Sequence, residues 1–436
     1  MKSTRTLPQK GYSQMANFCN HHVMQKFAHR SLRSLLTMFT ALIPSFSLAD
    51  VAAKKFAFTT PVAEGFQLVK NEDAYQTERG FGFDAGADKV RFFSVKVPEG
   101  NHRVTITLGS ETVATNTTIK AEMRRLMLEN ISTEVGEVVS HSFIVNTRTP
   151  LIEGSSKVSL KQPREVIDEA WAWDDRLTLE INGSNPVVRS IVIEPANVPT
   201  LYLCGDSTSC DQAKEPFNSW GQMITRFFQP GIAVANHGES GETVASSLRA
   251  RRFEKVYHLL KPGDFVMIQF GHNDMKNGNS ETYRAHLTQI TTEVKKRGAE
   301  LILITSMERM SGITKNTLLD FPEQVRHIAA QQRVTLIDLQ VLSQTLYQTI
   351  GAKDLAKLFA FADGKQDGTH HNNYGSYQLA QCVLHSLQKQ KHPLAKHIIE
   401  HFAYDPTQPT PMEHFEVPLS PAPQKIQRPD GDEDHP

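Results

Sequence analysis

Apolar and polar residues alternate along much of the chain between residues 51 and 198, as they do in strands with one buried face. Lys89–Val97 and His102–Leu108 both alternate, and Pro98–Asn101 between them has the composition of a turn, so these residues predict a hairpin. Further strands are predicted at Ser142–Thr147, Arg176–Ile181 and Val187–Ile193. Few stretches have helical periodicity, so we predict a β-sandwich domain over residues 51–198, long enough to fold on its own.

The pattern changes near Thr200, where short continuous apolar runs begin to alternate with amphipathic segments. The apolar runs are Leu201–Cys204, Ala233–Asn236, Phe265–Phe270, Leu301–Thr305 and Val334–Ile337. The helix-like segments are Trp220–Phe228, Val244–Leu260, Tyr283–Arg297, Pro322–Gln332 and Tyr377–Gln390. Apolar strands separated by helices are typical of a parallel sheet covered on both faces. We therefore predict an α/β domain over residues 199–403.

The N-terminal segment has the pattern of a secretory signal. Lys26, Arg30 and Arg33 precede an uncharged, largely apolar stretch that ends in the small residues Ser47 and Ala49. This order is typical of a signal peptide, whereas the alternative is a buried N-terminal helix. We expect residues 1–49 to be removed and the mature protein to be exported, to the periplasm or the extracellular space.

Composition excludes several classes of function. The chain has 436 residues with 47 Lys+Arg and 47 Asp+Glu, so it lacks the basic excess of a nucleic-acid-binding protein. No apolar run reaches the roughly 20 residues that span a bilayer, so we expect no integral membrane segment in the mature chain. Proline and acidic residues dominate near the end, which predicts a disordered tail over residues 404–436.

Polar loops follow the predicted strands of the α/β domain, at the sheet edge where open α/β sheets bind ligands. Ser207, in Gly205-Asp206-Ser207, follows the first strand and can present its hydroxyl and backbone N–H there. Gly241 follows the second strand, where it lets the backbone approach a ligand closely. Asn273, in Gly271-His272-Asn273-Asp274, follows the third strand.

A carboxylate and an imidazole lie near the end of the predicted domain. Asp367 and His370 are three residues apart, so the carboxylate can hydrogen-bond the imidazole and fix its tautomer. Each motif alone can equally be a turn, a polar loop or a helix cap. Together they supply a nucleophile, oxyanion donors, a base and an orienting acid, which is the set needed for acyl transfer.

The blocks Gly205-Asp206-Ser207, Gly241, Asn273 and Asp367-x-x-His370 resemble those of the SGNH (GDSL) hydrolase superfamily, over roughly Thr200–Leu387. Thr208, Trp220-Gly221, Arg252-Phe253 and Lys261-Pro262-Gly263-Asp264 are most similar to the rhamnogalacturonan acetylesterases within it. The resemblance implies a flavodoxin-like three-layer α/β/α fold with a parallel sheet, here preceded by a smaller, galactose-binding-like β-sandwich. Ser240-Gly241-Glu242-Thr243 stands where that subgroup often has Gly-Arg-Ser, which leaves the substrate open.

The same resemblance implies the role of each residue. Ser207 is expected to be the nucleophile, His370 the general base and then the general acid, and Asp367 the group that orients His370. The N–H groups of Ser207 and Gly241 and the side-chain amide of Asn273 are expected to form the oxyanion hole. Such a mechanism needs no metal and no cofactor.

The expected function is that of an exported carbohydrate esterase that removes O-acetyl groups from a plant cell-wall polysaccharide, with pectic rhamnogalacturonan as the first candidate. The expected partner is therefore an acetylated polysaccharide or oligosaccharide. A xylan acetylesterase and a GDSL-type lipase or lysophospholipase are alternatives within the superfamily. A non-catalytic sugar-binding protein is the alternative from another class.

A few other residues carry open alternatives. Arg252, with Arg249 and Arg251, either contacts the carboxylates of a galacturonate-containing substrate or lies on a solvated helix face. Trp171 and Trp173 share a face if their segment is a strand, where packing is favoured over sugar stacking. Cys204 and Cys210 form either a disulfide or two buried thiols. His371, next to His370, is expected to face away from Ser207.

Overall fold

The computed structural model describes residues 52–84, 90–277 and 279–421. The expected signal peptide lies outside the described residues. Within the described ranges, no helix has the length and apolar character needed to cross a membrane.

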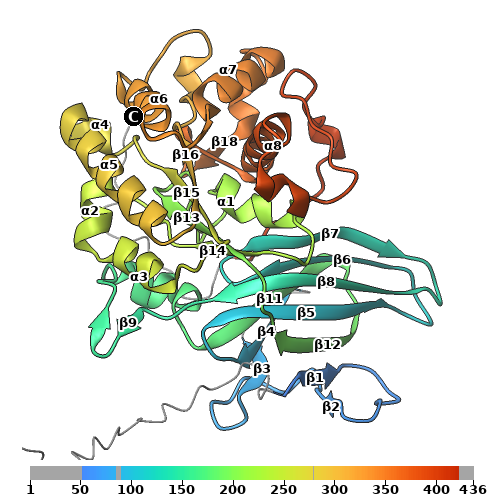
Figure 1. The fold of residues 1–436 in the computed structure, drawn as a ribbon. Coiled ribbons are helices and arrows are strands. Elements are labelled where there is room, and N and C mark those ends of the chain that lie inside the picture. The colour runs from blue at the N-terminus through green and yellow to red at the C-terminus, as the bar shows by residue number, and fades with distance from the viewer. Residues whose placement is uncertain (1–51, 85–89, 278, 422–436) are drawn as a thin grey trace, which may run out of the picture. The chain divides into compact units, whose positions relative to one another are not determined.

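The first part of the described chain is a sandwich of two five-stranded sheets (Figure 1). In spatial order, the first sheet contains β2 (Gln67–Leu68), β1 (Lys54–Ala57), β12 (Val188–Pro195), β5 (Gly100–Gly109) and β8 (Val138–Thr147). The second contains β3 (Phe81–Asp84), β4 (Arg91–Lys96), β11 (Arg176–Asn185), β6 (Thr115–Ala121) and β7 (Arg125–Thr133). Phe56, Val104 and Ile106 of the first sheet share a core with Phe93 and Leu179 of the second. The predicted sandwich is therefore confirmed.

The predicted hairpin is wrong. The two alternating stretches do form strands β4 and β5, but β4 pairs with β3 and β11, whereas β5 pairs with β12 and β8. The turn before Gly100 therefore carries the chain from one sheet to the other. Alternation predicted a buried face for each strand correctly, but it carries no information about which strand lies alongside.

A five-stranded parallel sheet forms the centre of the second part of the chain. Its strands, in spatial order, are β14 (Ala233–Asn236), β13 (Thr200–Gly205), β15 (Phe265–Gln269), β16 (Glu300–Ile304) and β17 (Thr335–Ile337). This is the flavodoxin-like order 2-1-3-4-5. Along β13, Leu201 and Leu203 contribute to one apolar core, and Tyr202 and Cys204 contribute to the core on the other face.

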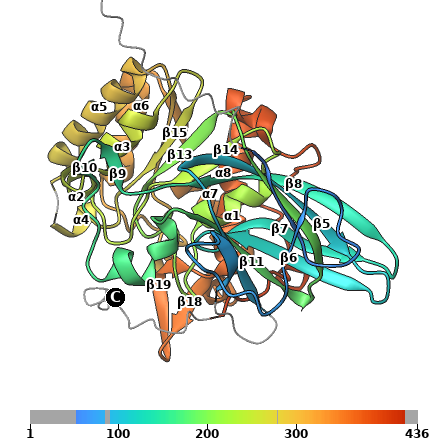
Figure 2. The ribbon, with the colours of Figure 1, turned by 90° about the horizontal axis from the view of Figure 1, so that it is seen from below.

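Helices cover both faces of this sheet, as Figures 1 and 2 show. One core includes residues of α1 (Trp220–Met223), α7 (Leu339–Ile350) and α8 (Asn373–Lys389). The other includes residues of α3 (Arg252–Leu259), α5 (Ser280–Lys296) and α6 (Phe321–Gln332). Two further α-helices of the described residues are α2 (Val244–Arg249) and α4 (Asp274–Asn277). The predicted three-layer α/β/α arrangement is confirmed.

Several observed elements differ from the predicted ones. Arg251 has a left-handed backbone with φ of 63°, which divides the predicted helix Val244–Leu260 into α2 and α3. Helix α7 and the hairpin of β18 (Phe359–Ala362) and β19 (Lys365–His371) were not predicted. Trp171 lies in a short 3₁₀ helix, Ala170–Ala172, and not in a strand. A second small hairpin, of β9 (Leu151–Glu153) and β10 (Ser156–Lys157), precedes it.

The β-sandwich and the α/β part are not separated by a solvated boundary. Leu126 of β7 belongs to the apolar core that covers one face of the parallel sheet, and Ile144 of β8 packs with Ala233. Arg125 Nη2 lies 2.7 Å from Asp211 Oδ2, and both side chains are buried. The described residues accordingly belong to one compact unit.

Part of the expected disordered tail is ordered. Lys120 Nζ donates to the carbonyl of Pro418 and to Ser420 Oγ, both at 2.7 Å, and Val417 is buried against the α/β core. Tyr374 in α8 donates to the carbonyl of Thr410 at 2.7 Å. The expectation of disorder is therefore wrong for residues 404–421, because this segment satisfies a buried lysine. Residues 422–436 lie outside the described part.

Candidate active site

Ser207 lies in a tight turn directly after β13. The buried carboxylate of Asp206 accepts hydrogen bonds from the Thr208 backbone N–H at 3.0 Å and the Thr208 hydroxyl at 2.7 Å. A side chain could not replace the hydrogen of Gly205, because a Cβ there would lie 2.1 Å from Ser209 Oγ and 2.5 Å from the carbonyl of Gln269. The Gly-Asp-Ser sequence therefore builds the turn that carries the serine hydroxyl.

His370 joins Ser207 to Asp367. His370 Nε2 lies 2.8 Å from Ser207 Oγ, and His370 Nδ1 lies 2.8 Å from Asp367 Oδ2. With its Nδ1–H donating to the carboxylate, Nε2 is the acceptor that faces the serine hydroxyl. Ser207 and His370 are 163 positions apart in the sequence, and Asp367 and His370 are 3 positions apart. The structure brings all three together.

The carboxylate of Asp367 is held by its own loop. Its Oδ1 accepts the backbone N–H groups of Thr369 at 2.6 Å and His370 at 2.7 Å. Partial burial acts to raise the pKa of Asp367, but the hydrogen bonds and positive charge of His370, together with these backbone N–H groups, outweigh burial and lower it to about 2. Asp367 is therefore ionised at neutral pH and fixes the tautomer of His370.

His371 points to different partners. Its ring is buried against Phe359, with ring centroids 4.2 Å apart, and its Nε2 is hydrogen-bonded to the Tyr347 hydroxyl at 2.8 Å. Burial, and then the neighbouring His370, lower the pKa of His371 to about 3, so this ring is neutral. The expectation that His371 faces away from Ser207 is confirmed.

Gly241 and Asn273 lie on two adjacent loops. Gly241 has a left-handed backbone with φ of 73° and is exposed. The amide of Asn273 donates to the carbonyl of Glu242 at 3.2 Å, and its Oδ1 accepts a hydrogen bond from Lys276 Nζ at 3.2 Å. The loop of Gly241 is tied to the serine loop by Gln212, whose amide donates to the Ser207 carbonyl at 2.6 Å and to Ser240 Oγ at 3.2 Å. The candidate oxyanion donors therefore belong to one connected set of loops.

Arg252 is not placed to contact a substrate. Its side chain is 2% exposed, and its two terminal nitrogens contact the Glu165 carboxylate at 2.9 and 2.5 Å. The guanidinium also lies over the Trp173 ring, 5.8 Å from the centroid. The expected contact of Arg252 with substrate carboxylates is therefore wrong, and so is the alternative of a solvated face, because a partner 87 positions earlier buries it.

The tryptophans and cysteines belong to the packing. Trp173 is buried and donates from Nε1 to Glu165 Oε1 at 2.9 Å, and Trp171 packs against Phe92 with ring centroids 4.8 Å apart. Cys204 and Cys210 are both free buried thiols. The two tryptophans are therefore packing residues, as favoured over sugar stacking, and the two cysteines are buried thiols and not a disulfide.

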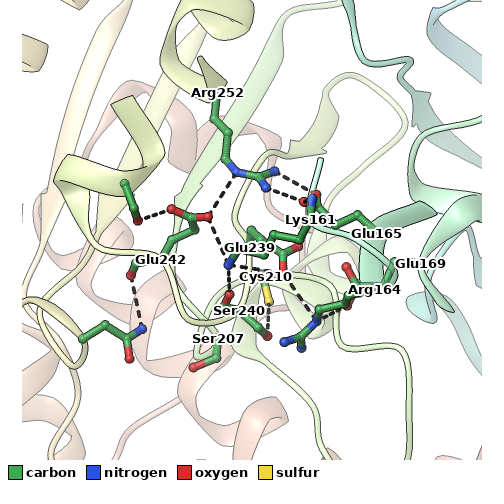
Figure 3. Close-up of polar contacts among 12 residues, drawn as sticks. Lys161, Arg164, Glu165, Glu169, Ser207, Cys210, Glu239, Ser240, Glu242 and Arg252 are labelled. Atoms are coloured by element: carbon green, nitrogen blue, oxygen red, sulfur yellow. Dashed lines mark hydrogen bonds and ion pairs between the residues drawn. The ribbon is translucent and has the colours of Figure 1, made fainter. Parts of the chain in front are cut away.

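Three buried carboxylates lie close enough together to bind a cation, with ligand atoms of Glu165, Glu169 and Glu239 within 4.8 Å of one another. Arginine side chains already face them: Arg164 Nε lies 2.8 Å from Glu169 Oε1 and 3.4 Å from Glu239 Oε1, and Arg252 holds Glu165 (Figure 3). Guanidinium groups of the chain itself therefore supply positive partners for these carboxylates. The metal-free mechanism stays a prediction.

Sequence reasoning missed a contact that the loop of Gly241 receives from the β-sandwich side of the chain. Lys161 Nζ lies 3.0 Å from Glu242 Oε1 and donates to the carbonyl of Ser240 (Figure 3). Lys161 stands in a charged stretch that is unremarkable in sequence, and its partners are about 80 positions away, at a separation of 79 for Ser240. No local pattern signals such a contact.

The fold and the site together define a class: a flavodoxin-like α/β hydrolase domain whose serine, histidine and aspartate are joined by hydrogen bonds. The comparison with known families agrees, since residues 203–376 match the model of the GDSL-like Lipase/Acylhydrolase family. These residues form a domain of that family, and the protein is a carboxylic ester hydrolase.

Known proteins resemble the chain over different lengths. It is 28% identical over 217 residues to the rhamnogalacturonan acetylesterase RhgT of Bacillus subtilis, a match covering 46% of this chain and 94% of that protein. It is 24% identical over 406 residues to the uncharacterized esterase YxiM of Bacillus subtilis, covering 84% of this chain and 99% of that protein. A crystal structure of protein YXIM from Bacillus subtilis superposes with a TM-score of 0.45 at 21% identity, covering 78% of this chain and 99% of that one.

Proposed function

We propose that this protein is an exported carbohydrate esterase that removes O-acetyl groups from pectic rhamnogalacturonan, with Ser207 as nucleophile. The observation that carries the proposal is the imidazole of His370, held 2.8 Å from both Ser207 Oγ and Asp367 Oδ2. The choice of substrate is supported by the similarity to RhgT, which is named a rhamnogalacturonan acetylesterase and matches over 94% of its own length.

In the acylation step, Ser207 Oγ attacks the acetyl carbonyl carbon while its proton passes to His370 Nε2. Asp367 stabilises the imidazolium that forms. The negative charge on the carbonyl oxygen is met by the N–H groups of Ser207 and Gly241 and by the amide of Asn273. The tetrahedral intermediate then collapses, the bond to the sugar oxygen breaks, and His370 returns its proton to that oxygen.

In the deacylation step, the acetyl-serine is hydrolysed by the same groups. His370 Nε2 takes a proton from water, whose oxygen attacks the acetyl carbon, and the same donors stabilise the second oxyanion. Collapse releases acetate, and His370 returns the proton to Ser207 Oγ. Every proton transfer is thereby assigned to one histidine.

Acetate release from a panel of esters tests the proposal. We expect turnover of acetylated rhamnogalacturonan oligosaccharides and of p-nitrophenyl acetate, little turnover of long-chain p-nitrophenyl esters, and no release by Ser207→Ala. Preference for acetylated xylan would overturn the substrate, and preference for long acyl chains would favour a lipase. Binding of the oligosaccharide without any hydrolysis would favour a sugar-binding protein.

Export is the second part of the proposal, and the pattern of residues 1–49 supports it. Expression of the full chain in a Gram-negative host should yield a mature protein that begins at Asp50 and is released with the periplasmic or extracellular fraction. An intact N-terminus in the cytoplasmic fraction would contradict export while leaving the esterase proposal standing.

A further inference from the structure

The loop that carries Gly241 is held by a side chain from outside the α/β part. The ammonium of Lys161 donates to the carbonyl of Ser240 and lies 3.0 Å from Glu242 Oε1 and 3.9 Å from Glu239 Oε1 (Figure 3). A Cβ added to Gly241 would lie 3.7 Å from this ammonium. Lys161 therefore contacts the residues on both sides of the expected oxyanion donor.

Lys161 is itself fixed at its backbone. Its N–H donates to Glu165 Oε2 at 2.7 Å, and its carbonyl accepts the N–H of Glu165 at 3.0 Å. Glu165 is fully buried and is held in turn by the two nitrogens of Arg252 in α3. The backbone of Lys161 is thus hydrogen-bonded to one partner of a buried ion pair, which restricts where its ammonium can lie.

The position of Glu242 affects both loops of the oxyanion hole. Its carboxylate faces Lys161 and accepts a hydrogen bond from Ser246, and its carbonyl accepts the amide of Asn273 at 3.2 Å. A shift of this residue would move the Gly241 N–H that precedes it and the Asn273 amide that is bonded to it. Misplacement of a catalytic group by about 1 Å can reduce a rate by about 10²-fold.

We propose that Lys161 is a positioning residue for the oxyanion hole, so that the β-sandwich side of the chain completes the active site. This inference rests on the proposed function, because it assumes that Gly241 and Asn273 stabilise an oxyanion. Lys161 acts through the loop and not through the substrate. Its ammonium is therefore expected to influence the transition state much more than substrate binding.

The test compares Lys161→Met with the matched control Lys157→Met, which removes an exposed lysine four residues earlier. With p-nitrophenyl acetate, we expect kcat to fall by about 10- to 100-fold for Lys161→Met with KM within about threefold, and no change for the control. Binding of a boronic acid, which forms a tetrahedral adduct with the serine, should weaken in parallel with kcat. Lys161→Arg should restore most of the activity.

A double-mutant cycle with Glu242→Gln provides a measurement that does not depend on one variant. If Lys161 acts through Glu242, the double variant should lose no more kcat than the worse single variant. Additive losses would overturn the proposal, as would a kcat of Lys161→Met within twofold of the wild type. If Lys161→Met fails to fold, Lys161→Arg takes its place in the test. A Lys161→Arg protein that has wild-type stability but loses as much kcat as Glu242→Gln would also overturn the proposal.

Two further outcomes separate this inference from the proposed function. A rise in KM for acidic oligosaccharides alone, with kcat unchanged, would make Lys161 a substrate contact and overturn the positioning role. Wild-type hydrolysis that persists in Ser207→Ala would refute the proposed function, whereas loss in Ser207→Ala with an unaffected Lys161→Met would refute only the inference.

Discussion

Two adjacent histidines have opposite environments in this protein. The His370 ring is held at both nitrogens by Ser207 and Asp367, whereas the His371 ring is buried against Phe359 and Tyr347. Sequence spacing could not separate them, because residues three and four positions after Asp367 are both neighbours on a helix. The extended conformation of β19, in which successive side chains point to opposite faces, separates them.

His370→Ala should therefore reduce kcat on a soluble acetyl ester by about 10⁴-fold or more, nearly as much as Ser207→Ala, because the two residues act as a unit. His371→Ala should change kcat by less than about tenfold, but it should lower the thermal midpoint because it leaves a cavity beside Phe359 and removes one hydrogen bond of the Tyr347 hydroxyl. The measurement is steady-state kinetics with thermal unfolding followed by circular dichroism. A larger kcat loss for His371→Ala than for His370→Ala would show that His371, and not His370, is the base.

Asp367→Asn should give a loss of kcat between those of His371→Ala and His370→Ala. The substitution retains the base but removes the charge and the acceptor that fix the Nδ1–H tautomer, for which a loss of about 10³- to 10⁴-fold is typical. The loss should appear in kcat with little change in KM. An activity equal to that of the wild type would show that Asp367 does not orient His370.

At the scale of elements, the ion pair between η2 (Arg164–Asp168) and α3 supports the Gly241 loop, since Arg252 Nε also lies 3.7 Å from Glu242 Oε1. Glu165 and Arg252 are both buried and share two hydrogen bonds. Removing one partner of a buried pair leaves the other charge uncompensated, at a loss of about 3–5 kcal/mol of unfolding free energy. Such a loss would be visible as a change of stability and not of substrate preference.

Arg252→Met should therefore destabilise the protein by about that amount in denaturant unfolding, with KM for an acidic oligosaccharide unchanged. Arg249→Met is the matched control, since Arg249 is exposed three residues earlier, and it should stay within about 0.5 kcal/mol of the wild type. A stable Arg252→Met protein with a raised KM for acidic substrates would restore the original expectation that Arg252 binds substrate.

The elements also show which features a sequence can predict. The parallel strands were found because burial on both faces makes each one a continuous apolar run, and the loops after them carry the polar residues of the site. The pairing of β4 and β5 was missed because alternation describes one strand at a time. The burial of Arg252 and the contact of Lys161 were missed because each depends on a partner far along the chain.

For the whole molecule, the described residues lie in one compact unit, within which the β-sandwich and the α/β part share contacts. A chain that starts at Pro199 would lose Arg125, which is paired with Asp211, and Glu165, which is paired with Arg252. It would also lose Leu126 from the α/β core. The length of the β-sandwich suggested independent folding, whereas these shared contacts predict the opposite.

We expect the chain from residue 199 to be insoluble or to lack a cooperative unfolding transition, whereas the chain from residue 50 should fold and hydrolyse p-nitrophenyl acetate. Solubility, circular dichroism and the same ester assay are the measurements. A soluble, cooperatively folded fragment with wild-type kcat would show that the β-sandwich is not needed for the site, and it would also contradict the role of Lys161.

The stability of the whole molecule should depend on pH through Glu122. This side chain is buried and accepts the N–H of Thr178 at 3.0 Å, and burial, opposed mainly by the charge of Arg125, raises the pKa of Glu122 to about 8. Since this value lies above that of the unfolded chain, the native state retains the proton longer. The contribution of Glu122 is fully present below about pH 4.5 and is lost as the pH rises through 8.

Glu122→Gln keeps the group neutral at every pH, so the fall in thermal midpoint between pH 5 and about pH 9 should be smaller than in the wild type. Burial also raises the pKa of Glu239, so part of the fall should remain. Glu134→Gln, a substitution at an exposed position, is the control and should leave the pH profile unchanged. Equal slopes for Glu122→Gln and the wild type would show that Glu122 is ionised in the native state.

The central claim is that Ser207 is a nucleophile activated by His370, and covalent labelling tests it most directly. Treatment with a fluorophosphonate, followed by peptide mass spectrometry, should give a single stoichiometric adduct on Ser207. The adduct should be absent from Ser207→Ala and should form at least about 10²-fold more slowly in His370→Ala. An adduct on a different residue, or labelling of Ser207→Ala at the wild-type rate, would contradict the claim.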